Sequence, residues 1–522
     1  MNSTQSDDRS PPSSAARRSH RVAIVGAGIS GLAAAHRLRE LDPRVEVAVF
    51  EAGSRAGGAI ATVANDGFLA ELGPDNFISQ PATAIELCSR LGLAEQLIAV
   101  EPSARSAYVV SRGKLVRLPE GFALMAPRRV SSFLASPLLS WPGKLRVLAE
   151  PLVPTRTDDA DESLADFARR RLGREAFERI VQPLVAGIYT ADPEKLSMRA
   201  ALRRFFDFER RDGGLLRSLS RETQAIVPGG DHAASPGQQS GPRYNLFVTP
   251  RDGMQVLITA LLERLPADAL RFNSPVTSVS PLAQTDNADA TATGWRVTWR
   301  RATDPQELVE NFDELMLALP APRCAELVAN FATDLSAELR NIDYAGAAVI
   351  VAGYERSQVS HPLDASGFVV PAIERHPILA CSFSSSKYAG RAATGKVLLR
   401  VFVGGACDPQ AGELPDTELH TIVAAQLGEL IGLRGTPCFW HVARWPASMP
   451  QYYVGHCDRV ARIESLAERW PSLTLAGNAY HGVGIPACIA SGEAAAERVL
   501  KRRAPCSERG RDVNVDVIGQ VS

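Results

Sequence analysis

The sequence predicts an α/β protein built in several parts: a discontinuous Rossmann-like dinucleotide-binding domain, a substrate domain with a mixed sheet, and an inserted, mainly helical domain. Three observations lead to this fold class. The chain opens on a strand, glycine turn and helix in VAIVGAGISGLAAA, and it closes on a second such pattern in LTLAGNAYHGVGIPACIASG. Between them, helical patterns give way to strand patterns after residue 245. A chain of 522 residues also exceeds one simple core.

These patterns divide the chain into eight segments. In order they are a disordered N-terminal tail (1–20), the first part of the dinucleotide-binding domain (21–83), the mainly helical insert (84–225), a flexible insertion (222–244), the second part of the dinucleotide-binding domain (245–320), the substrate-binding domain (321–470), the third part of the dinucleotide-binding domain (471–502) and a loose C-terminal tail (503–522). The tails and the insertion are polar and rich in Ser, Pro, Gly or Gln, so they bury little apolar area.

Composition excludes several function classes. The net charge is -1 and the pI about 6.8, so no strong positive field attracts nucleic acid. The eight cysteines form no CxxC pair, which argues against a zinc site and favours a reducing compartment. No charge-free apolar run is long enough to span a bilayer. We therefore expect a cytoplasmic protein without a metal site, and leave peripheral contact with the inner face of the cytoplasmic membrane open.

The first glycine turn predicts a pyrophosphate site. Residues 21–25 form an apolar, β-branched strand and residues 32–41 have helical spacing. In such a unit one glycine permits the tight turn, one lets the backbone approach the phosphates, and one lets helix and strand pack closely. The helix N-terminus then presents free N–H groups to the anion. The turn residues expected to bind are Gly26, Ala27, Gly28, Ile29, Ser30 and Gly31.

The next residues favour FAD over NAD. A second strand, VEVAVF, ends at Glu51, whose carboxylate is placed to accept hydrogen bonds from a ribose diol. A second glycine pair and Arg55 follow directly; the arginine either reaches the pyrophosphate or forms a surface ion pair. A nicotinamide enzyme has no need of this second segment. The expected contacts here are Glu51, Ala52, Arg55, Gly57, Gly58 and Ala59, then Gly73, Pro74, Asp75 and Asn76.

Later segments complete this domain. Residues 244–265 predict a strand, a glycine turn and a helix, and residues 274–280 predict a strand that lays Val276 along the adenine. Residues 313–320 predict another buried strand. Near the C-terminus Val483, Gly484 and Ile485 open a long helix, whose N-terminus we expect to face the pyrimidine end of the flavin.

Together, several motifs in order identify a resemblance. They are GAGISGLAAA, RAGGAIAT, ELGPDNF, SPLLSWPGKLRVLAEP, VAGIYTADPEKLSM, SFSSSKYAGR, RWPASMPQYYVGH and AGNAYHGVGIPACIASG. From about residue 20 to residue 501 the chain resembles the oxygen-dependent protoporphyrinogen oxidase family of the amine-oxidase-like flavoproteins. The segment 185–198 is the most diagnostic of them.

This resemblance implies an FAD enzyme of heme biosynthesis that takes six electrons from a porphyrinogen, with O₂ or another acceptor reoxidising the flavin. O₂ would yield hydrogen peroxide. Protoporphyrinogen IX is the first expectation for the substrate, and coproporphyrinogen III stays open as the alternative. Because the flavin carries the chemistry, no catalytic side chain is singled out. Two alternatives stay open: another amine oxidase or desaturase of the superfamily, and a non-catalytic flavin-binding scaffold.

The resemblance also suggests substrate contacts. Gly187, Phe368, Val370 and Tyr388 are expected to form an apolar slot, and Trp445 to flank the flavin; ordinary core packing is the alternative for the aromatic residues. Mitochondrial-type relatives carry an arginine that pairs with a propionate at the position of Ala107. Arg105 would lie on the same face of a strand and either replaces it or is a solvated charge.

Residues 118–150 suggest a membrane contact, the use the resembled family makes of this region. Phe133, Leu134, Leu138, Leu139 and Trp141 lie among basic residues, as in an interfacial helix. A lid packed on its own domain is the alternative, and a homodimer stays open as a further partner.

Overall fold

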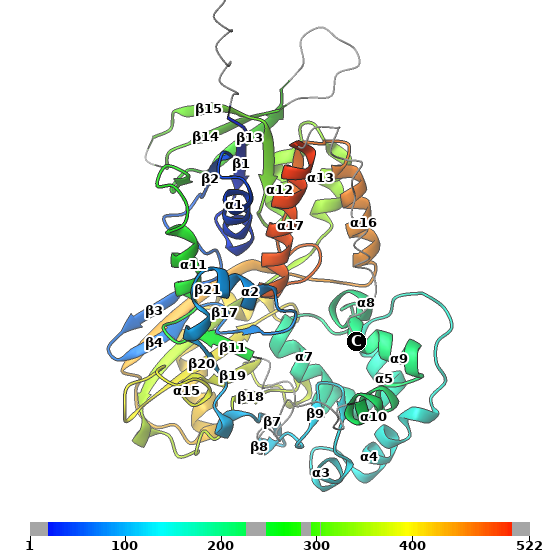
Figure 1. Cartoon of the computed structure of the whole chain (residues 1–522). Coiled ribbons are helices and arrows are strands. Elements are labelled where there is room, and N and C mark those ends of the chain that lie inside the picture. The colour runs from blue at the N-terminus through cyan, green and yellow to red at the C-terminus, as the bar shows by residue number, and fades with distance from the viewer. Residues whose placement is uncertain (1–18, 226–246, 283–293, 303, 504–522) are drawn as a thin grey trace, which may run out of the picture.

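The computed structural model of the chain describes residues 19–225, 247–282, 294–302 and 304–503. The mixed α/β class is confirmed: Figure 1 shows a sheet-and-helix region that contains both the first and the last helices, a second region built on a large sheet, and a helical region beside it. The tails expected at 1–20 and 503–522 and the insertion expected at 222–244 lie mostly outside the described residues, which omit 1–18, 226–246 and 504–522; residues 222–225 are the end of α10.

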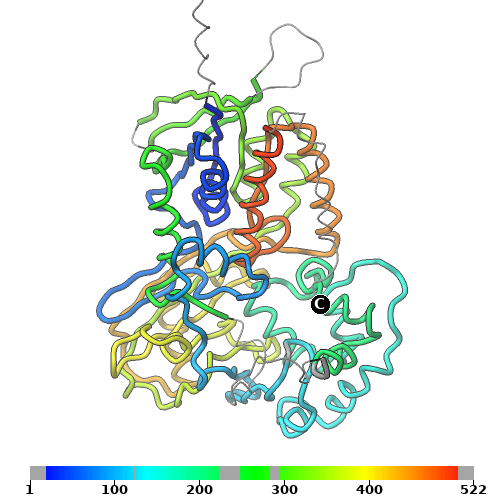
Figure 2. Tube along the Cα trace, in the orientation of Figure 1, coloured from blue at the N-terminus to red at the C-terminus, as the bar shows by residue number. Residues whose placement is uncertain are grey.

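A five-stranded parallel sheet gathers segments from the whole chain. Its order is β12-β2-β1-β16-β22, and all four pairings are parallel. The strands are β1 (Arg21–Val25), β2 (Glu46–Phe50), β12 (Leu270–Arg271), β16 (Glu314–Leu317) and β22 (Leu473–Leu475). Their apolar residues are buried on both faces, as parallel strands require. The parallel sheet is therefore discontinuous in sequence, and the tube in Figure 2 shows the first and last coloured segments side by side.

Four helices cover one face of this sheet around a shared core: α1 (Ile29–Leu41), α2 (Thr83–Arg90), α11 (Gln255–Leu262) and α17 (Ile485–Arg503). Helix α17 crosses α1 at Gly492. A Cβ there would lie 2.1 Å from the carbonyl oxygen of Ser30, so only glycine permits this approach.

A small antiparallel sheet covers the opposite face. It has the order β13-β14-β15, from β13 (Val276–Pro281), β14 (Trp295–Arg300) and β15 (Glu307–Phe312). Trp295, Val297 and Trp299 pack against the parallel sheet together with α12 (Ala321–Val328), α13 (Thr333–Arg340) and α16 (His456–Ala467). The strand expected at 274–280 is present as β13, which pairs with β14 alone and lies outside the parallel sheet.

The second region is built on a seven-stranded mixed sheet of order β21-β17-β20-β19-β18-β7-β8. Its strands are β21 (Phe439–Pro450), β17 (Tyr344–Glu355), β20 (Lys396–Gly404), β19 (Ala380–Phe383), β18 (Gly367–Val369), β7 (Tyr108–Ser111) and β8 (Lys114–Arg117). Helix α15 (Asp416–Ile431) packs on one face. The hairpin of β3 (Thr62–Asn65) and β4 (Phe68–Glu71) packs on part of the other.

The predicted helical insert needs a correction at its start. Strands β7 and β8 fall within residues 84–225 but belong to the seven-stranded sheet. Strand β6 (Leu97–Ala99) lies in a small sheet with β11 (Phe247–Pro250) and β5 (Phe77–Ile78). Strands β9 (Phe122–Ala123) and β10 (Ala126–Pro127) form a further small antiparallel pair in the insert. The remainder is mainly helical around one apolar core and contains the helices α3 (Val130–Ala135), α4 (Trp141–Leu148), α5 (Leu164–Leu172), α6 (Arg174–Ala176), α7 (Gln182–Tyr189), α8 (Met198–Ala201), α9 (Arg203–Asp212) and α10 (Leu215–Ala225).

A buried ion pair holds the helical region together. The side chains of Arg171 and Glu150 are fully buried, and Arg171 Nε donates to Glu150 Oε1 over 2.7 Å. Glu150 also accepts from the backbone N–H groups of Leu215 (2.9 Å) and Leu216 (3.1 Å), and Arg171 donates to the Val153 carbonyl (3.0 Å). Every charge is thus matched by hydrogen bonds, the condition under which a buried pair is tolerated.

We predict that Glu150→Ala lowers the free energy of unfolding by about 3–5 kcal/mol, because it leaves the buried Arg171 charge with only the weaker 3.5 Å contact to Glu209. The measurement is the urea midpoint followed by far-UV circular dichroism. The matched control is Glu194→Ala, which removes the surface partner of Arg169 and should cost about 1 kcal/mol or less. Equal midpoints for the two variants would contradict the assigned role.

Candidate active site

The three glycines of the first turn have two different functions. A Cβ at Gly26 would lie 2.4 Å from the Ala318 carbonyl oxygen, and one at Gly31 would lie 2.0 Å from the Gly26 carbonyl oxygen. Neither position has room for a side chain, so close backbone packing requires glycine at both. A Cβ at Gly28, in contrast, would meet no atom of the described residues within 4 Å, and its φ of -70° suits any residue. The protein itself gives no reason for glycine at this position, so the open space is suited to a ligand.

The surroundings of Gly28 fit a dinucleotide. Glu51 follows β2, and its carboxylate accepts from the N–H of Ala27 (3.0 Å) and of Gly53 (2.8 Å), which fixes it beside the turn. Gly57 N–H donates to the Ala27 carbonyl oxygen over 2.8 Å, so the second glycine loop closes on the first. No side chain caps the N-terminus of α1 and no acidic residue lies in its first turn, which leaves that end available to an anion.

The second glycine loop is fixed by its own arginine. Arg55 donates to the carbonyl oxygens of Gly58 (2.7 Å) and Ile60 (2.9 Å), and its guanidinium lies 6.0 Å from the ring of Trp445. Arg55 therefore shapes the loop that contains Ala52 and Ala59. Its contact with the pyrophosphate stays a prediction.

The segment Gly73–Asn76 lies against this loop. A Cβ at Gly73 would lie 1.8 Å from the Ala59 carbonyl oxygen and 3.7 Å from the Trp445 ring. Trp445 Nε1 donates to the Leu72 carbonyl over 2.8 Å, so strand β21 brings this tryptophan to the predicted cofactor segment. The structure thus gathers Arg55, Gly73 and Trp445 from distant parts of the sequence.

The C-terminal loop reaches the same region through α17. This helix begins at Ile485, and Gly484 before it is exposed. The loop is held by Tyr452, whose hydroxyl accepts from Gly482 N–H over 2.8 Å and donates to the Asn478 carbonyl over 2.5 Å. Val483 packs toward the core of the helical region.

Val276 follows a segment in which Ser274 N–H donates to the Glu51 carbonyl over 2.8 Å. The contact of Val276 with adenine stays a prediction.

A buried ion cluster surrounds Asp75, and two of its members, Lys387 and Arg400, were not predicted from the sequence. Asp75 Oδ2 lies 3.0 Å from Lys387 Nζ and 3.2 Å from Arg400 Nη1, and Asn76 Nδ2 donates to Asp75 Oδ1 over 2.6 Å. Burial raises the pKa of Asp75, but the two cations outweigh it and lower the pKa to about 2. The sequence does contain a signal for this cluster: Arg400 is a charged residue inside the otherwise apolar strand KVLLRVFVG, where it needs a buried partner.

The predicted substrate residues do not share one surface. Gly187 is exposed on α7, and a Cβ there would lie 3.4 Å from Val369 Cγ1. Phe368 is only 2% exposed and, like Val370, packs into the core beneath α15. Successive residues of a strand face opposite sides. The residue that faces Gly187 is therefore Val369, one position away from each predicted side chain.

Tyr388 and Arg105 have polar atoms without protein partners. Tyr388 is 1% exposed and packs with Val100 and Ala104, and its hydroxyl has no hydrogen-bond partner in the part of the chain the structure describes. Within the same residues the Nε of Arg105 has none either, and Arg105 forms no ion pair. Their contacts with a substrate stay predictions.

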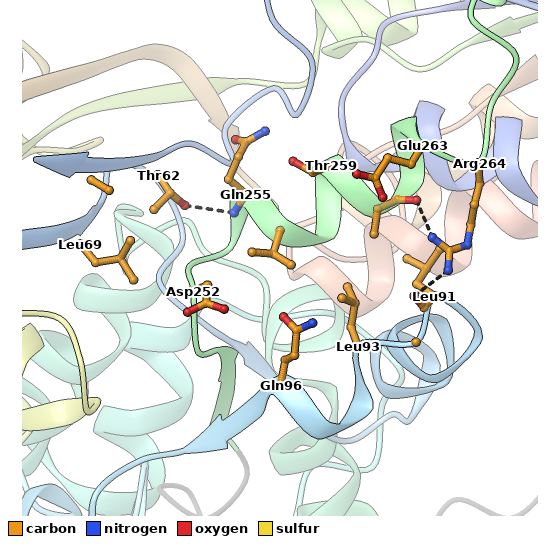
Figure 3. Close-up of a pocket in the computed structure, with 14 residues that line it drawn as sticks. Thr62, Leu69, Leu91, Leu93, Gln96, Asp252, Gln255, Thr259, Glu263 and Arg264 are labelled. Carbon is orange, nitrogen blue, oxygen red and sulfur yellow. Dashed lines mark hydrogen bonds between the residues drawn. The ribbon is translucent and has the colours of Figure 1, made fainter.

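Figure 3 shows a separate cavity of about 550 Å³ between the β3–β4 hairpin, the loop after α2 and helix α11. Thr62, Leu69, Leu93, Gln255 and Thr259 are among its lining residues. None of the residues predicted to bind cofactor or substrate lines it. It is therefore distinct from the region around Gly28, Gly57 and Gly73, where the cofactor is expected.

Comparison with known proteins agrees with this geometry. The family described as flavin containing amine oxidoreductase matches residues 29–500. The chain belongs to this family. This oxidoreductase uses FAD, and the turn at Gly28, the Glu51 carboxylate and the α1 N-terminus fit that cofactor.

Relatives of this flavin oxidoreductase align with nearly the whole length of the chain. The coproporphyrinogen III oxidase of Staphylococcus aureus is 30% identical over 485 residues, which are 92% of this chain and 98% of that protein. The mitochondrial protoporphyrinogen oxidase of Nicotiana tabacum is 28% identical and covers 92% and 94%. A crystal structure from Exiguobacterium sp. 255-15, described provisionally as a protoporphyrinogen oxidase, superposes with a TM-score of 0.78 at 28% identity and covers 93% and 99%.

We predict that Gly28→Val abolishes retention of FAD, because its side chain would occupy the space the diphosphate needs. Gly28→Ala should weaken retention. The measurement is the ratio of flavin to protein absorbance after purification, with circular dichroism to verify folding. The matched control is Gly428→Ala, whose Cβ would make an ordinary 3.6 Å contact with the Leu433 carbonyl oxygen. A Gly28→Val protein that purifies with a full complement of FAD would refute the role.

Proposed function

We propose that this flavin oxidoreductase oxidises a porphyrinogen to a porphyrin, with O₂ as the electron acceptor. The observation that carries the proposal is the apolar surroundings of Gly187 on α7, where an added Cβ would lie 3.4 Å from Val369 Cγ1 of β18. Tyr189 and Val369 are partly buried against the helical core, as is Val483 of the C-terminal loop. An apolar surface beside the cofactor loop is suited to a flat, hydrophobic macrocycle.

The side chains of this region are suited to positioning and not to proton transfer. Bound FAD would supply the acceptor for hydride, and O₂ would restore it with release of hydrogen peroxide. Gly187 exposes backbone without a side chain, so a macrocycle could approach α7 closely. Val369 adds an apolar wall that excludes water. A porphyrinogen is already electron-rich, so this environment requires no acid or base of its own.

The relatives favour coproporphyrinogen III as the substrate, ahead of the protoporphyrinogen IX that the sequence analysis put first. Proteins named coproporphyrinogen III oxidase from Staphylococcus aureus, Bacillus subtilis and Propionibacterium freudenreichii are 30%, 30% and 33% identical to the chain. Two of the named protoporphyrinogen oxidases are 28% and 27% identical. The replacement of the propionate-pairing arginine by Ala107, with Arg105 nearby, agrees with a different set of carboxylate contacts.

We predict that coproporphyrinogen III bleaches the flavin absorbance under anaerobic conditions faster than protoporphyrinogen IX does. Admission of air should restore the absorbance and release peroxide. The measurement is stopped-flow absorbance of the FAD-loaded protein with each porphyrinogen. Faster bleaching by protoporphyrinogen IX would overturn the substrate choice, and no bleaching by either would overturn the proposed function.

An amine oxidase is the second candidate, because the family description names amine substrates. An amine site would need aromatic side chains exposed beside the C-terminal glycine loop. Tyr480 of that loop is instead buried among the core residues of the parallel sheet. The same bleaching experiment with primary amines and polyamines tests this candidate.

We also propose a peripheral membrane contact, at different residues from those expected. Phe133, Leu138 and Leu139 belong to the core of the helical region. Trp141, Leu145 and Leu152 are instead 64%, 62% and 81% exposed. Trp141 and Leu145 are one helical turn apart on α4, so they share a face. Among the described residues no helix is long and apolar enough to cross a bilayer. This face would therefore lie on the membrane surface, on its cytoplasmic side.

We predict that the double variant Trp141→Ser/Leu145→Ser weakens binding to anionic phospholipid vesicles by at least about tenfold, because two large apolar side chains no longer enter the interface. Co-sedimentation measures the binding. The control is Val309→Ser, which removes an exposed apolar residue from the distant strand β15. Equal binding by the wild type and the double variant would contradict this contact.

A further inference from the structure

The ion cluster around Asp75 links the seven-stranded sheet to the cofactor loop. Lys387 ends the short helix α14 (Ser384–Lys387), and Arg400 lies in the middle of β20. Besides Asp75, Arg400 donates to the carbonyl oxygen of Gly73. Because Gly73 packs against Ala59, the two cations hold the segment that lies on the second glycine loop. The cluster is therefore joined to the flavin site by direct contacts.

The cluster carries a surplus of positive charge. Among the described residues, one carboxylate faces two cations, and the side chains of Lys387, Arg400 and Asp75 are only 13%, 3% and 16% exposed. Two further buried groups, Glu71 and Arg391, add one charge of each sign nearby. Water therefore screens the surplus charge poorly.

Two buried groups of the cluster have polar atoms without a partner among the described residues. These are Arg400 Nε and the hydroxyl of Tyr388. Both residues are almost completely buried, and Arg391 lies over the ring of Tyr388 at 5.7 Å. Buried donors without acceptors are costly. Their presence beside the cofactor loop points to an acceptor group that the protein does not supply.

We propose that Lys387 and Arg400, fixed by Asp75, are positioning residues that hold the Gly73–Asn76 segment against the flavin and stabilise its reduced form electrostatically. Two-electron reduction by hydride brings negative charge into this region, and a desolvated cation stabilises such charge. The inference rests on FAD binding and is independent of which substrate delivers the electrons.

The test is the midpoint potential of the FAD-loaded protein, measured with a chemical reductant and a reference dye, so that no porphyrinogen is needed. Lys387→Met should shift the equilibrium constant for two-electron reduction at least tenfold toward the oxidised form, about 30 mV lower in potential. Asp75→Asn removes the negative charge with little change of shape, and should shift the equilibrium constant for reduction toward the reduced form. Lys387→Arg should restore the wild-type potential. The control is Lys114→Met at an exposed position of the edge strand β8.

Opposite shifts in Lys387→Met and Asp75→Asn, with no shift in Lys114→Met, support the proposal. Unchanged potentials in variants that retain FAD overturn it, because a purely structural cluster would not act on the potential. If Lys387→Met fails to retain FAD, the direction of the change in midpoint potential in Asp75→Asn alone decides whether the proposal holds. Failure of the porphyrinogen assay would leave these potentials interpretable, so the two proposals fail separately.

Discussion

The structure depends on the close approach of backbones at three glycines. Gly31 packs against the Gly26 carbonyl, Gly26 against that of Ala318, and Gly492 against that of Ser30. Each contact leaves no room for a Cβ, so these three positions fix how α1 lies between the parallel sheet and α17. The contact at Gly492 thereby holds α17 against the first turn of α1.

The local patterns were sufficient to predict much of this arrangement. Apolar runs followed by glycine turns are local properties of the sequence. The order of residues was therefore enough to place the strands near Val22, Val47 and Leu315 and the turn at Gly28. The use of three separated segments also follows, because one βαβ unit cannot fill a sheet. Strand pairing is different, since it depends on partners far away in sequence. For this reason β7 and β8 were assigned to the helical insert, although they pair within the seven-stranded sheet.

The candidate site was predicted in the same uneven way. The glycine loops were found because their spacing is diagnostic, whereas the predicted slot missed Val369 by one residue. In a strand a shift of one position reverses the face, and sequence alone does not give the face when both sides are apolar. Lys387 and Arg400 were missed because their partner, Asp75, is more than 300 residues away along the chain. Only the folded sheet shows that their charges meet.

The order of strands in the parallel sheet has a consequence for how the protein is made. Strand β1 is flanked by β2 and β16, and β22, near the C-terminus, pairs with β16. A nascent chain on the ribosome therefore exposes the unpaired edge of β1 until residue 314 has emerged, and the sheet is complete only after residue 475. Helix α17 can therefore pack on α1 only at the last stage of synthesis, after nearly the whole chain has emerged.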